Sequence, residues 1–408
     1  MINLLSAVWA KLLWLLSADT LLSIIGVGFA LGLVILVHEL GHFLACRLLD
    51  MRVEEFSIGF GKLLKKWKKG ETQYSLRAIP LGGYVKPSGE FYAREADISN
   101  PRDFAAKPWY SRALMVFAGA GMNYVLAFII FFIVVLSMGL PVTNPTKIPS
   151  VVGEVISDYP ASGVLQTDDV ITAIDGKAVS NWQEMVTSLD AAAQNGKAEV
   201  SYVRNGQDNV SSLFFTKDNK IGISVKPVYE RTGVFEALWV AGHQCYYWTA
   251  LSLTTIADKL WHKQAPDVAG PIGIFEIVGK GVHSGVENYF FLIGLISVAI
   301  GMFNLFPIPI LDGGHILFFI IEGIRGKRAK EKTLMRASSV GASLLILLVL
   351  YATYNDIARI GRRVTKQAQT QTVATEQAAP AAQSEERSAD AGGAQAEGLA
   401  RAEQEVKE

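Results

Sequence analysis

Cysteine is nearly absent from this chain of 408 residues, in which only Cys46 and Cys245 occur. Two cysteines cannot build the disulfide framework of a small secreted protein. Lys and Arg balance Asp and Glu at 38 each, so the chain lacks the basic excess typical of proteins that bind nucleic acid. The start, MINLLSAVWAKLLWLLSAD, lacks a basic N-terminal region and a clear small-residue cleavage site, which argues against a removable signal peptide.

Long hydrophobic runs, in contrast, are abundant. Half of the residues are hydrophobic, and the mean hydropathy is +0.27. Four segments are long and apolar enough to cross about 30 Å of hydrocarbon at about 1.5 Å of helix per residue. They are residues 21–49, 113–140, 288–321 and 337–354. The sequence therefore predicts a polytopic α-helical membrane protein with about four transmembrane helices in a lipid bilayer.

The charges between these segments predict their orientation. The loop 47–112 holds 13 Lys or Arg against 8 Asp or Glu, and the loop 325–336 holds 6 against 1. The positive-inside rule places both loops in the cytoplasm, so that the first and third spans run in the same direction. The connection between the second and third spans is expected outside. The uncharged segment 237–257 is rich in aromatic and hydroxyl side chains, which favours an interfacial helix over a fifth span.

Residues 147–229 are expected to form a small β-rich domain inserted between the second and third spans. Short β-branched runs are separated by the turn sequences IDGK and RNGQ, and residues 181–194 supply one helix. The runs are VVGEVI, DVITAI, AEVSYVR and SSLFF. Their order resembles a PDZ domain of the bacterial permuted type, a fold that binds an extended chain as an added strand. A structural β domain without a ligand is the alternative.

The stretch VILVHELGHFLAC in the first span places polar side chains in an otherwise apolar helix. His38 and His42 are four residues apart, so both project from one helix face and can bind one metal ion. Glu39 beside them suits a general base. A polar or charged side chain in a transmembrane helix costs several kcal/mol and tends to persist only for function. A polar kink or a proton-relay cluster is the alternative interpretation.

A zinc ion held by two histidines needs a third protein ligand, with a fourth position left for water. Cys46 lies about 12 Å from His38 along a straight helix, too far to share an ion. Asp312, in NLFPIPILDGGH, is the only acidic residue of the predicted third span. It follows two prolines that break the helix and leave backbone hydrogen-bonding groups unpaired. Such groups are tolerated at membrane depth only beside a cavity. Asp312 is therefore the predicted third ligand, and His315 is the alternative.

Together these motifs resemble the site-2 protease family of intramembrane zinc metalloproteases, in particular its bacterial regulator of sigma E protease branch. HELGH in the first span, NxxPxPxLDGG in a later span and a PDZ-like insert occur here in the family's order, over about residues 20–355. The resemblance implies that His38, His42 and Asp312 bind zinc and that Glu39 activates a water molecule.

The resemblance also implies how substrates are handled. It assigns substrate-binding roles to Asn123 in AGAGMN and to Asn304 in the LDG motif. The implied substrates are transmembrane segments of single-pass membrane proteins, such as anti-sigma factors or signal-peptide remnants, cleaved after prior trimming in regulated intramembrane proteolysis. The implied location is the bacterial inner membrane, with the PDZ-like domain outside the cytoplasm. Two departures are Ala120, where the family usually has proline, and an insert with room for about one PDZ domain.

Two other functional classes remain open at this point. One is a membrane scaffold whose PDZ-like domain binds exposed termini and whose metal site is vestigial, and intact HELGH and LDGG argue against it. The other is a metal transporter, for which a second, inverted set of ligands would be expected.

The predicted organisation divides the chain into six parts. They are an N-terminal lead-in (1–20), the first part of the membrane core (21–146) with a basic β-like loop (50–111), the PDZ-like domain (147–229), an interfacial helix and linker (230–286), the second part of the membrane core (287–356) and a disordered tail (357–408).

Overall fold

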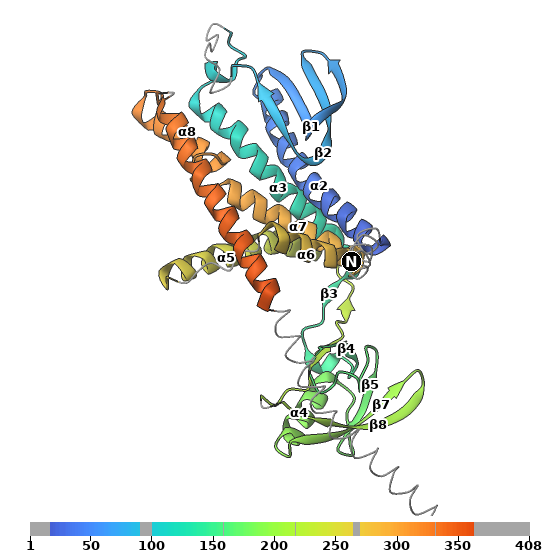
Figure 1. Cartoon of the computed structure of the whole chain (residues 1–408). Helices are drawn as coiled ribbons and strands as arrows, with labels where there is room; N and C mark the ends of the chain where they lie inside the picture. Colours follow the sequence, from blue (N-terminus) through green and yellow to red (C-terminus); the bar gives the residue numbers. More distant parts are fainter. Residues whose placement is uncertain are drawn as a thin grey trace, which may run out of the picture.

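The computed structural model describes residues 17–89, 100–157, 159–216, 218–263, 270–330 and 332–362. Four helices in these ranges are long and apolar enough to cross a membrane. They are α2 (Ala18–Leu48), α3 (Trp109–Met138), α7 (Val286–Asn304) and the C-terminal helix Lys332–Arg362. Helix α3 packs against both α2 and α7, and these helices form the elongated bundle of Figure 1. The prediction of a polytopic helical membrane protein is confirmed.

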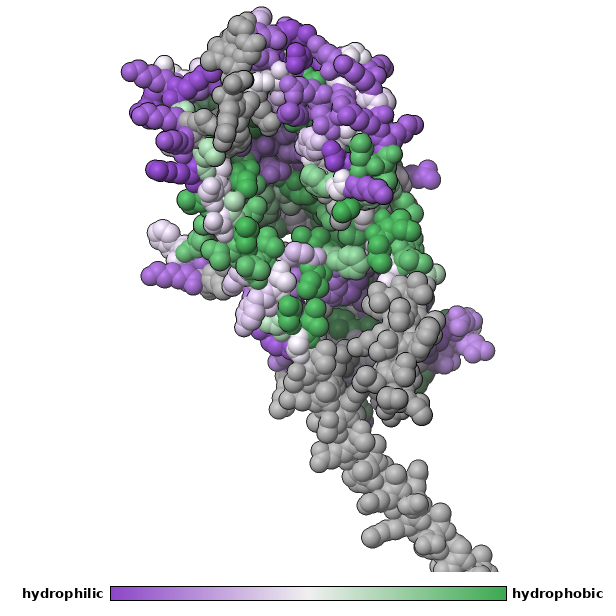
Figure 2. Space-filling model, turned by 45° about the horizontal axis from the view of Figure 1, so that its top comes forward, coloured by the Kyte–Doolittle hydropathy of each residue, from purple (hydrophilic) through white to green (hydrophobic). Residues whose placement is uncertain are grey.

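The outer surface of the bundle matches a lipid environment. Figure 2 shows a belt of hydrophobic residues across the visible face, below a hydrophilic cap. Large side chains such as Ile25, Phe29 and Ile133 point outward from α2 and α3. Their exposure is unfavourable in water but costs nothing in hydrocarbon. Other side chains, among them Ala30, Val34 and Ile293, form the buried core of the bundle.

The predicted third span is two helices rather than one. Helix α7 ends at Asn304, and α8 (Asp312–Arg325) begins after seven intervening residues. The prediction that Pro307 and Pro309 break the helix is confirmed, because neither proline can donate a backbone hydrogen bond. Gly313 and Gly314 allow the chain to turn back tightly, since a Cβ atom on either would lie 2.2–2.3 Å from a carbonyl oxygen of the break. Asp312 therefore sits at the start of a helix in the interior of the bundle.

The loop that is predicted to be cytoplasmic forms a long β hairpin on α2. Strands β1 (Val53–Lys69) and β2 (Thr72–Pro87) are antiparallel, and Phe56 of β1 lies opposite both Tyr74 and Val85. The ring of Phe43 in α2 packs 5.1 Å from that of Phe56. The expected β-like character of the loop is confirmed, and β1 continues through the basic stretch as far as Lys69. Every residue from Phe60 to Lys69 is exposed, and the apolar and Lys residues of this stretch do not alternate, so its sequence lacks the period of two that is typical of a strand.

The inserted domain is β-rich with one helix, as expected. Its described elements are β4 (Val152–Val155), β5 (Val170–Ile174), β6 (Lys177–Ala178), α4 (Trp182–Ala193), β7 (Lys197–Arg204), β8 (Gln207–Phe214) and β9 (Ile223–Val225). The strands pair in the order β6-β5-β7-β8, with β4 against β9. The predicted turns at Asp175–Gly176 and Asn205–Gly206 have positive φ at both residues, as tight hairpins require. The shorter strands β6 and β9 escaped prediction.

A short ribbon joins the inserted domain to the bundle. Strands β3 (Leu140–Pro141) and β10 (Tyr229–Glu230) are antiparallel, and the Val142 N–H donates to the Val228 carbonyl at 2.8 Å. Both ends of the insert therefore leave the bundle at one point, just beyond the end of α3. Figure 1 shows the domain below the bundle and the β1–β2 hairpin at the other end.

Two further helices follow the insert. Helix α5 (Val234–Trp261) crosses the bundle at a steep angle in Figure 1, in keeping with a helix that does not span the membrane. Helix α6 (Pro271–Val282) escaped prediction because it is short and contains three glycines. Two predicted boundaries shift: α2 already begins within the expected lead-in, and the last helix runs to Arg362, into the expected tail. The rest of both segments lies outside the described residues.

The inserted domain contains a buried ion pair that provides a test of its stability. Asp169 is 1% exposed and accepts two hydrogen bonds from Arg204, at 2.8 and 2.7 Å, and one from the Gln166 N–H. Burial alone would raise the pKa of Asp169, but these hydrogen bonds outweigh it and hold the pKa below its ordinary value. The ionised carboxylate thus stabilises the fold above the ordinary pKa of about 4, and this contribution is lost as the pH falls through the lowered value.

We expect Arg204→Met to destabilise the inserted domain strongly at pH 7, because it leaves a buried carboxylate without its counter-charge. Hydrogen exchange of β5 and β7 in the full chain should accelerate by at least about tenfold. The matched control is Lys226→Met, which breaks the exposed pair with Asp168 and should change exchange little. Equal effects of the two substitutions would contradict this assignment.

Candidate metal centre

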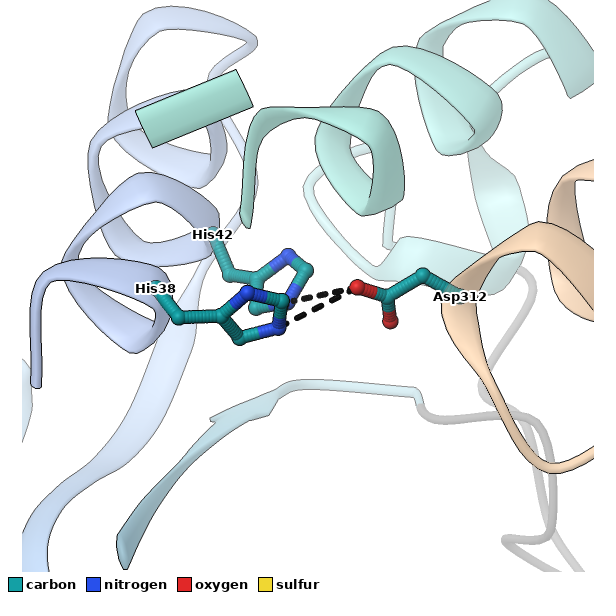
Figure 3. A group of neighbouring side chains, drawn as sticks. All are labelled: His38, His42 and Asp312. Atoms are coloured by element: carbon teal, nitrogen blue, oxygen red, sulfur yellow. Dashed lines mark hydrogen bonds and ion pairs between the residues drawn. The ribbon is translucent and has the colours of Figure 1, made fainter. Parts of the chain in front are cut away.

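Three side chains that are distant in the sequence converge inside the bundle. His38 and His42 project from one face of α2 toward Asp312 at the start of α8, as Figure 3 shows. The Nε2 atoms of the two histidines are 3.1 Å apart, and Asp312 Oδ2 lies 3.1 Å from the first and 3.6 Å from the second. Both imidazoles are buried. This is a group of donor atoms of the kinds that bind zinc.

The spacing of the three donor atoms fits a tetrahedral ion. Donors bound at about 2.0–2.1 Å to a tetrahedral zinc are separated from one another by roughly 3.3–3.4 Å. The observed separations of 3.1, 3.1 and 3.6 Å bracket that value. Asp312 Oδ2 is also buried and accepts no hydrogen bond within the described part of the chain. A cation between the three atoms would satisfy it, so these residues fit the metal that the sequence predicts.

The contacts of helix α3 orient both imidazoles. Nδ1 of His42 lies 3.0 Å from the Met115 carbonyl oxygen, which can only accept a hydrogen bond. Nδ1 therefore carries the proton, and Nε2 keeps the lone pair that a metal needs. Nδ1 of His38 lies 3.3 Å from the side-chain amide of Asn123, which is fully buried. Each imidazole thus has a partner on α3 for the nitrogen that faces away from Asp312.

The close approach of α2 and α3 depends on two glycines. A Cβ atom on Gly119 would lie 2.3 Å from Nε2 of His42 and 3.0 Å from Cε1 of His38, and one on Gly41 would lie 2.2 Å from the Ala118 carbonyl oxygen. All three distances are shorter than van der Waals contact, and those to His42 and Ala118 are far shorter. Gly119 was not among the predicted site residues, although it lies in the run AGAG and small residues mark close helix contacts in membranes.

Glu39 lies beside these three side chains and faces a cavity of about 220 Å³. The backbone N–H of Val85 in β2 donates to the Glu39 carboxylate, so the hairpin closes one side of the cavity. His42, Asp312 and His315 line the same space. The remaining lining is largely apolar and consists of Tyr84, Val85, Pro87, Phe104, Met115 and Val116. An acid, a cluster of potential metal ligands and an apolar pocket therefore share one cavity.

The other residues singled out from the sequence occupy different positions. His315 lines the cavity but does not belong to the group of three converging donors, which favours Asp312 as the third ligand. Cys46 is buried in an apolar cluster with Met51 and Phe319. Asn304 is the last residue of α7, is half-buried and is absent from the described lining of the cavity. Its role in substrate binding stays a prediction.

Helix α8, which carries Asp312, is fixed to α3 by a buried ion pair. A guanidinium nitrogen of Arg112 donates to Glu322 at 2.5 Å, and the same guanidinium lies 4.8 Å from the centre of the Phe319 ring. The Arg112 side chain is 5% exposed. Because ion pairs strengthen where water is excluded, this contact fixes the C-terminal half of α8 against α3.

Comparison with known proteins agrees with this geometry. Residues 27–348 match the model of peptidase family M50. The chain belongs to this family of site-2 proteases. A Clostridium acetobutylicum protein described as a zinc metalloprotease is 33% identical over 335 residues, which cover 80% of this chain and 95% of that one. Zinc metalloprotease RasP of Geobacillus kaustophilus is 28% identical, with 84% and 99% covered, and metalloprotease MmpA of Caulobacter vibrioides is 28% identical, with 83% and 96% covered.

Among solved structures, the PDZ domain of an SdrC-like protein from Listeria monocytogenes is similar to part of the chain. It is 26% identical, covers 21% of this chain and 90% of that one, and has a TM-score of 0.18. With the family established, the prediction of a membrane-bound metalloprotease is confirmed.

Gly119→Ala tests the close contact between α2 and α3. We expect the added methyl group to displace both imidazoles and to reduce zinc content and proteolysis by at least about tenfold, since small displacements at a metal site are costly. Zinc content is measured by atomic absorption on purified protein. The control is Gly121→Ala on the same helix, where the new methyl would meet only the Phe117 ring at 3.6 Å. Normal zinc content in Gly119→Ala would show that the site does not need the space beside the imidazoles that Gly119 leaves.

Proposed function

We propose that this protein is a zinc-dependent intramembrane endopeptidase in which His38, His42 and Asp312 bind the metal and Glu39 is the general base. The observation that carries the proposal is the tetrahedral spacing of three donor atoms beside a carboxylate, inside helices that are apolar enough to lie in a membrane. Bound zinc would polarise the scissile carbonyl and lower the pKa of a water molecule from 15.7 toward about 7.

The chain's own groups perform the proton transfers. Glu39 projects into the cavity next to His42 and Asp312, so its carboxylate can accept a proton from the attacking water and pass it to the leaving amine. The Val85 N–H holds this carboxylate in place. The lining of the cavity is largely apolar, and apolar surroundings strengthen the electrostatic interactions within it.

A transmembrane substrate has to be unwound before it can be cleaved, because its peptide carbonyls are hydrogen-bonded within the helix. The end of β2 offers a means of holding the unwound chain. Residues 83–87 pair with β1 on one side, and the Val85 N–H points from the other side toward Glu39. We propose that the substrate adds to this edge as an extended strand.

The proposed substrates are transmembrane segments of single-pass membrane proteins, such as anti-sigma factors or signal-peptide remnants. The site lies near the hairpin end of the bundle, at the level of Met115, whereas the inserted domain leaves the far end of α3 beyond Met138. With the basic hairpin in the cytoplasm, the inserted domain is extracytoplasmic. There it would exclude substrates with bulky outer domains and admit substrates that another protease has already trimmed. We therefore propose regulated intramembrane proteolysis as the cellular role.

We expect Glu39→Gln to keep zinc and lose proteolysis, because the amide cannot accept a proton. A general base contributes about 10²–10⁴-fold to a rate, so the rate of cleavage of a model transmembrane substrate should fall at least about 10²-fold. Asp312→Ala should lose both zinc and activity, because two histidines alone do not complete the site. Full zinc occupancy in Asp312→Ala would refute the third-ligand assignment and move the test to His315.

Removal of the inserted domain tests the proposed selection of substrates. Because the Val142 N–H bonds to the Val228 carbonyl, residues 143–227 can be replaced by a short linker without separating the ends of the bundle. We expect the shortened enzyme to keep its zinc and to cleave substrates with long outer domains, which the full enzyme rejects. The assay compares long and trimmed forms of one substrate. Equal rejection of the long form by both enzymes would show that the domain does not select by size.

A further inference from the structure

The amide of Asn123 has one satisfied and one unsatisfied end. The side chain is fully buried between α2 and α7. Its Nδ2 lies 3.3 Å from Nδ1 of His38, while its Oδ1 is buried and has no hydrogen-bond partner among the described residues. A buried acceptor without a partner costs about 1–3 kcal/mol, so this arrangement requires an explanation.

The chemistry of the imidazole provides one, and it rests on the proposed function. If Nε2 of His38 gives its lone pair to a metal, the single proton of the neutral ring is on Nδ1. Nδ1–H and the Nδ2–H of Asn123 are then two donors facing each other, while the acceptor Oδ1 points elsewhere. A turn of the amide by 180° about its own axis places Oδ1 opposite Nδ1–H of His38, so the two donors no longer face each other and the acceptor gains a partner, while Nδ2 takes the position that has no described partner. The two ends of a carboxamide have nearly the same size, so no neighbour needs to move.

We infer that Asn123 is a positioning residue of the metal centre, with its Oδ1 accepting a hydrogen bond from Nδ1–H of His38. The second histidine shows the same arrangement, since Nδ1 of His42 faces the carbonyl oxygen of Met115. Met115, Gly119 and Asn123 follow one another at intervals of four residues, so they form one face of α3. That face gives each imidazole an acceptor and, at Gly119, the space that both rings occupy.

The surroundings of Asn123 fix it in this role. The Ser297 hydroxyl in α7 donates to the backbone carbonyl oxygen of Asn123 at 2.8 Å. A Cβ atom on Gly301 would lie 3.2 Å from the Asn123 Cβ. The backbone is therefore held from the side opposite His38. Asn123 is also absent from the described lining of the cavity. These contacts favour support of a ligand over the substrate-binding role that the family resemblance implied.

The test compares two substitutions of similar size in the full chain. Asn123→Asp keeps an acceptor and has no donor, and Asn123→Leu has neither. The affinity for zinc is measured by competition with a chelator on purified protein. We expect Asn123→Leu to bind zinc about 10–100-fold more weakly, as is usual when the hydrogen-bond partner of a ligand is lost, and Asn123→Asp to bind within about threefold of the unsubstituted protein.

The outcomes separate this inference from the proposed function. If the unsubstituted protein binds no zinc, or His38→Ala binds it equally well, the proposed metal site is wrong. If that site stands and Asn123→Leu keeps full affinity, or Asn123→Asp is as weak as Asn123→Leu, the inference is wrong. The second result would mean that the amide donates to His38. Should Asn123→Leu fail to fold, Asn123→Asp decides alone: near-normal affinity supports the inference, and a loss of tenfold or more overturns it.

Discussion

The structure depends on one constraint, which is that polar side chains within membrane helices need partners because neither lipid nor the packed interior supplies water. Two imidazoles and a carboxylate lie together in the bundle, and each is held by groups from other elements. Met115 and Asn123 face the histidines from α3, and the Arg112–Glu322 pair fixes the helix that carries Asp312. Small residues at the α2–α3 contact make this geometry possible. Close packing of the helices is thus what brings hydrogen-bond partners to the buried polar side chains.

The break between α7 and α8 follows from the same constraint. In a continuous helix, the path of the helix axis would determine how far the carboxylate lies from the histidines. Pro307 and Pro309 end α7, and Gly313 and Gly314 fold the chain back, so that Asp312 enters the interior from a helix start. The C-terminal helix approaches this irregular backbone closely, because a Cβ atom on Gly341 would lie 2.9 Å from the Pro309 carbonyl oxygen. The sequence NLFPIPILDGG therefore encodes a local fold as well as a candidate ligand.

Much of this organisation could be predicted from the sequence, and the failures have physical causes. The spans follow from hydropathy, and the turns at Asp175–Gly176 and Asn205–Gly206 follow from residues that tolerate positive φ. The pattern HELGH names two donors and a base because helical periodicity fixes their common face. Gly119 and Asn123 could not be assigned in this way, since their roles depend on the tertiary contact of α3 with α2. The basic part of β1, residues 62–69, has no recognisable strand pattern, because its apolar and Lys residues do not alternate.

The architecture separates the proposed chemistry from the proposed selection of substrates. The described side chains that surround the cavity come from α2, α3, α8, the hairpin and the segment before α3, and none comes from the inserted domain. That domain has an apolar core of its own, and it meets the bundle through the short ribbon of β3 and β10. A module attached at one point cannot tune the donor atoms at the other end of α3, but it can occupy the space through which a substrate approaches. The position of the insert therefore favours control of access, while the reactivity of the site depends on the packing of α2, α3 and α8.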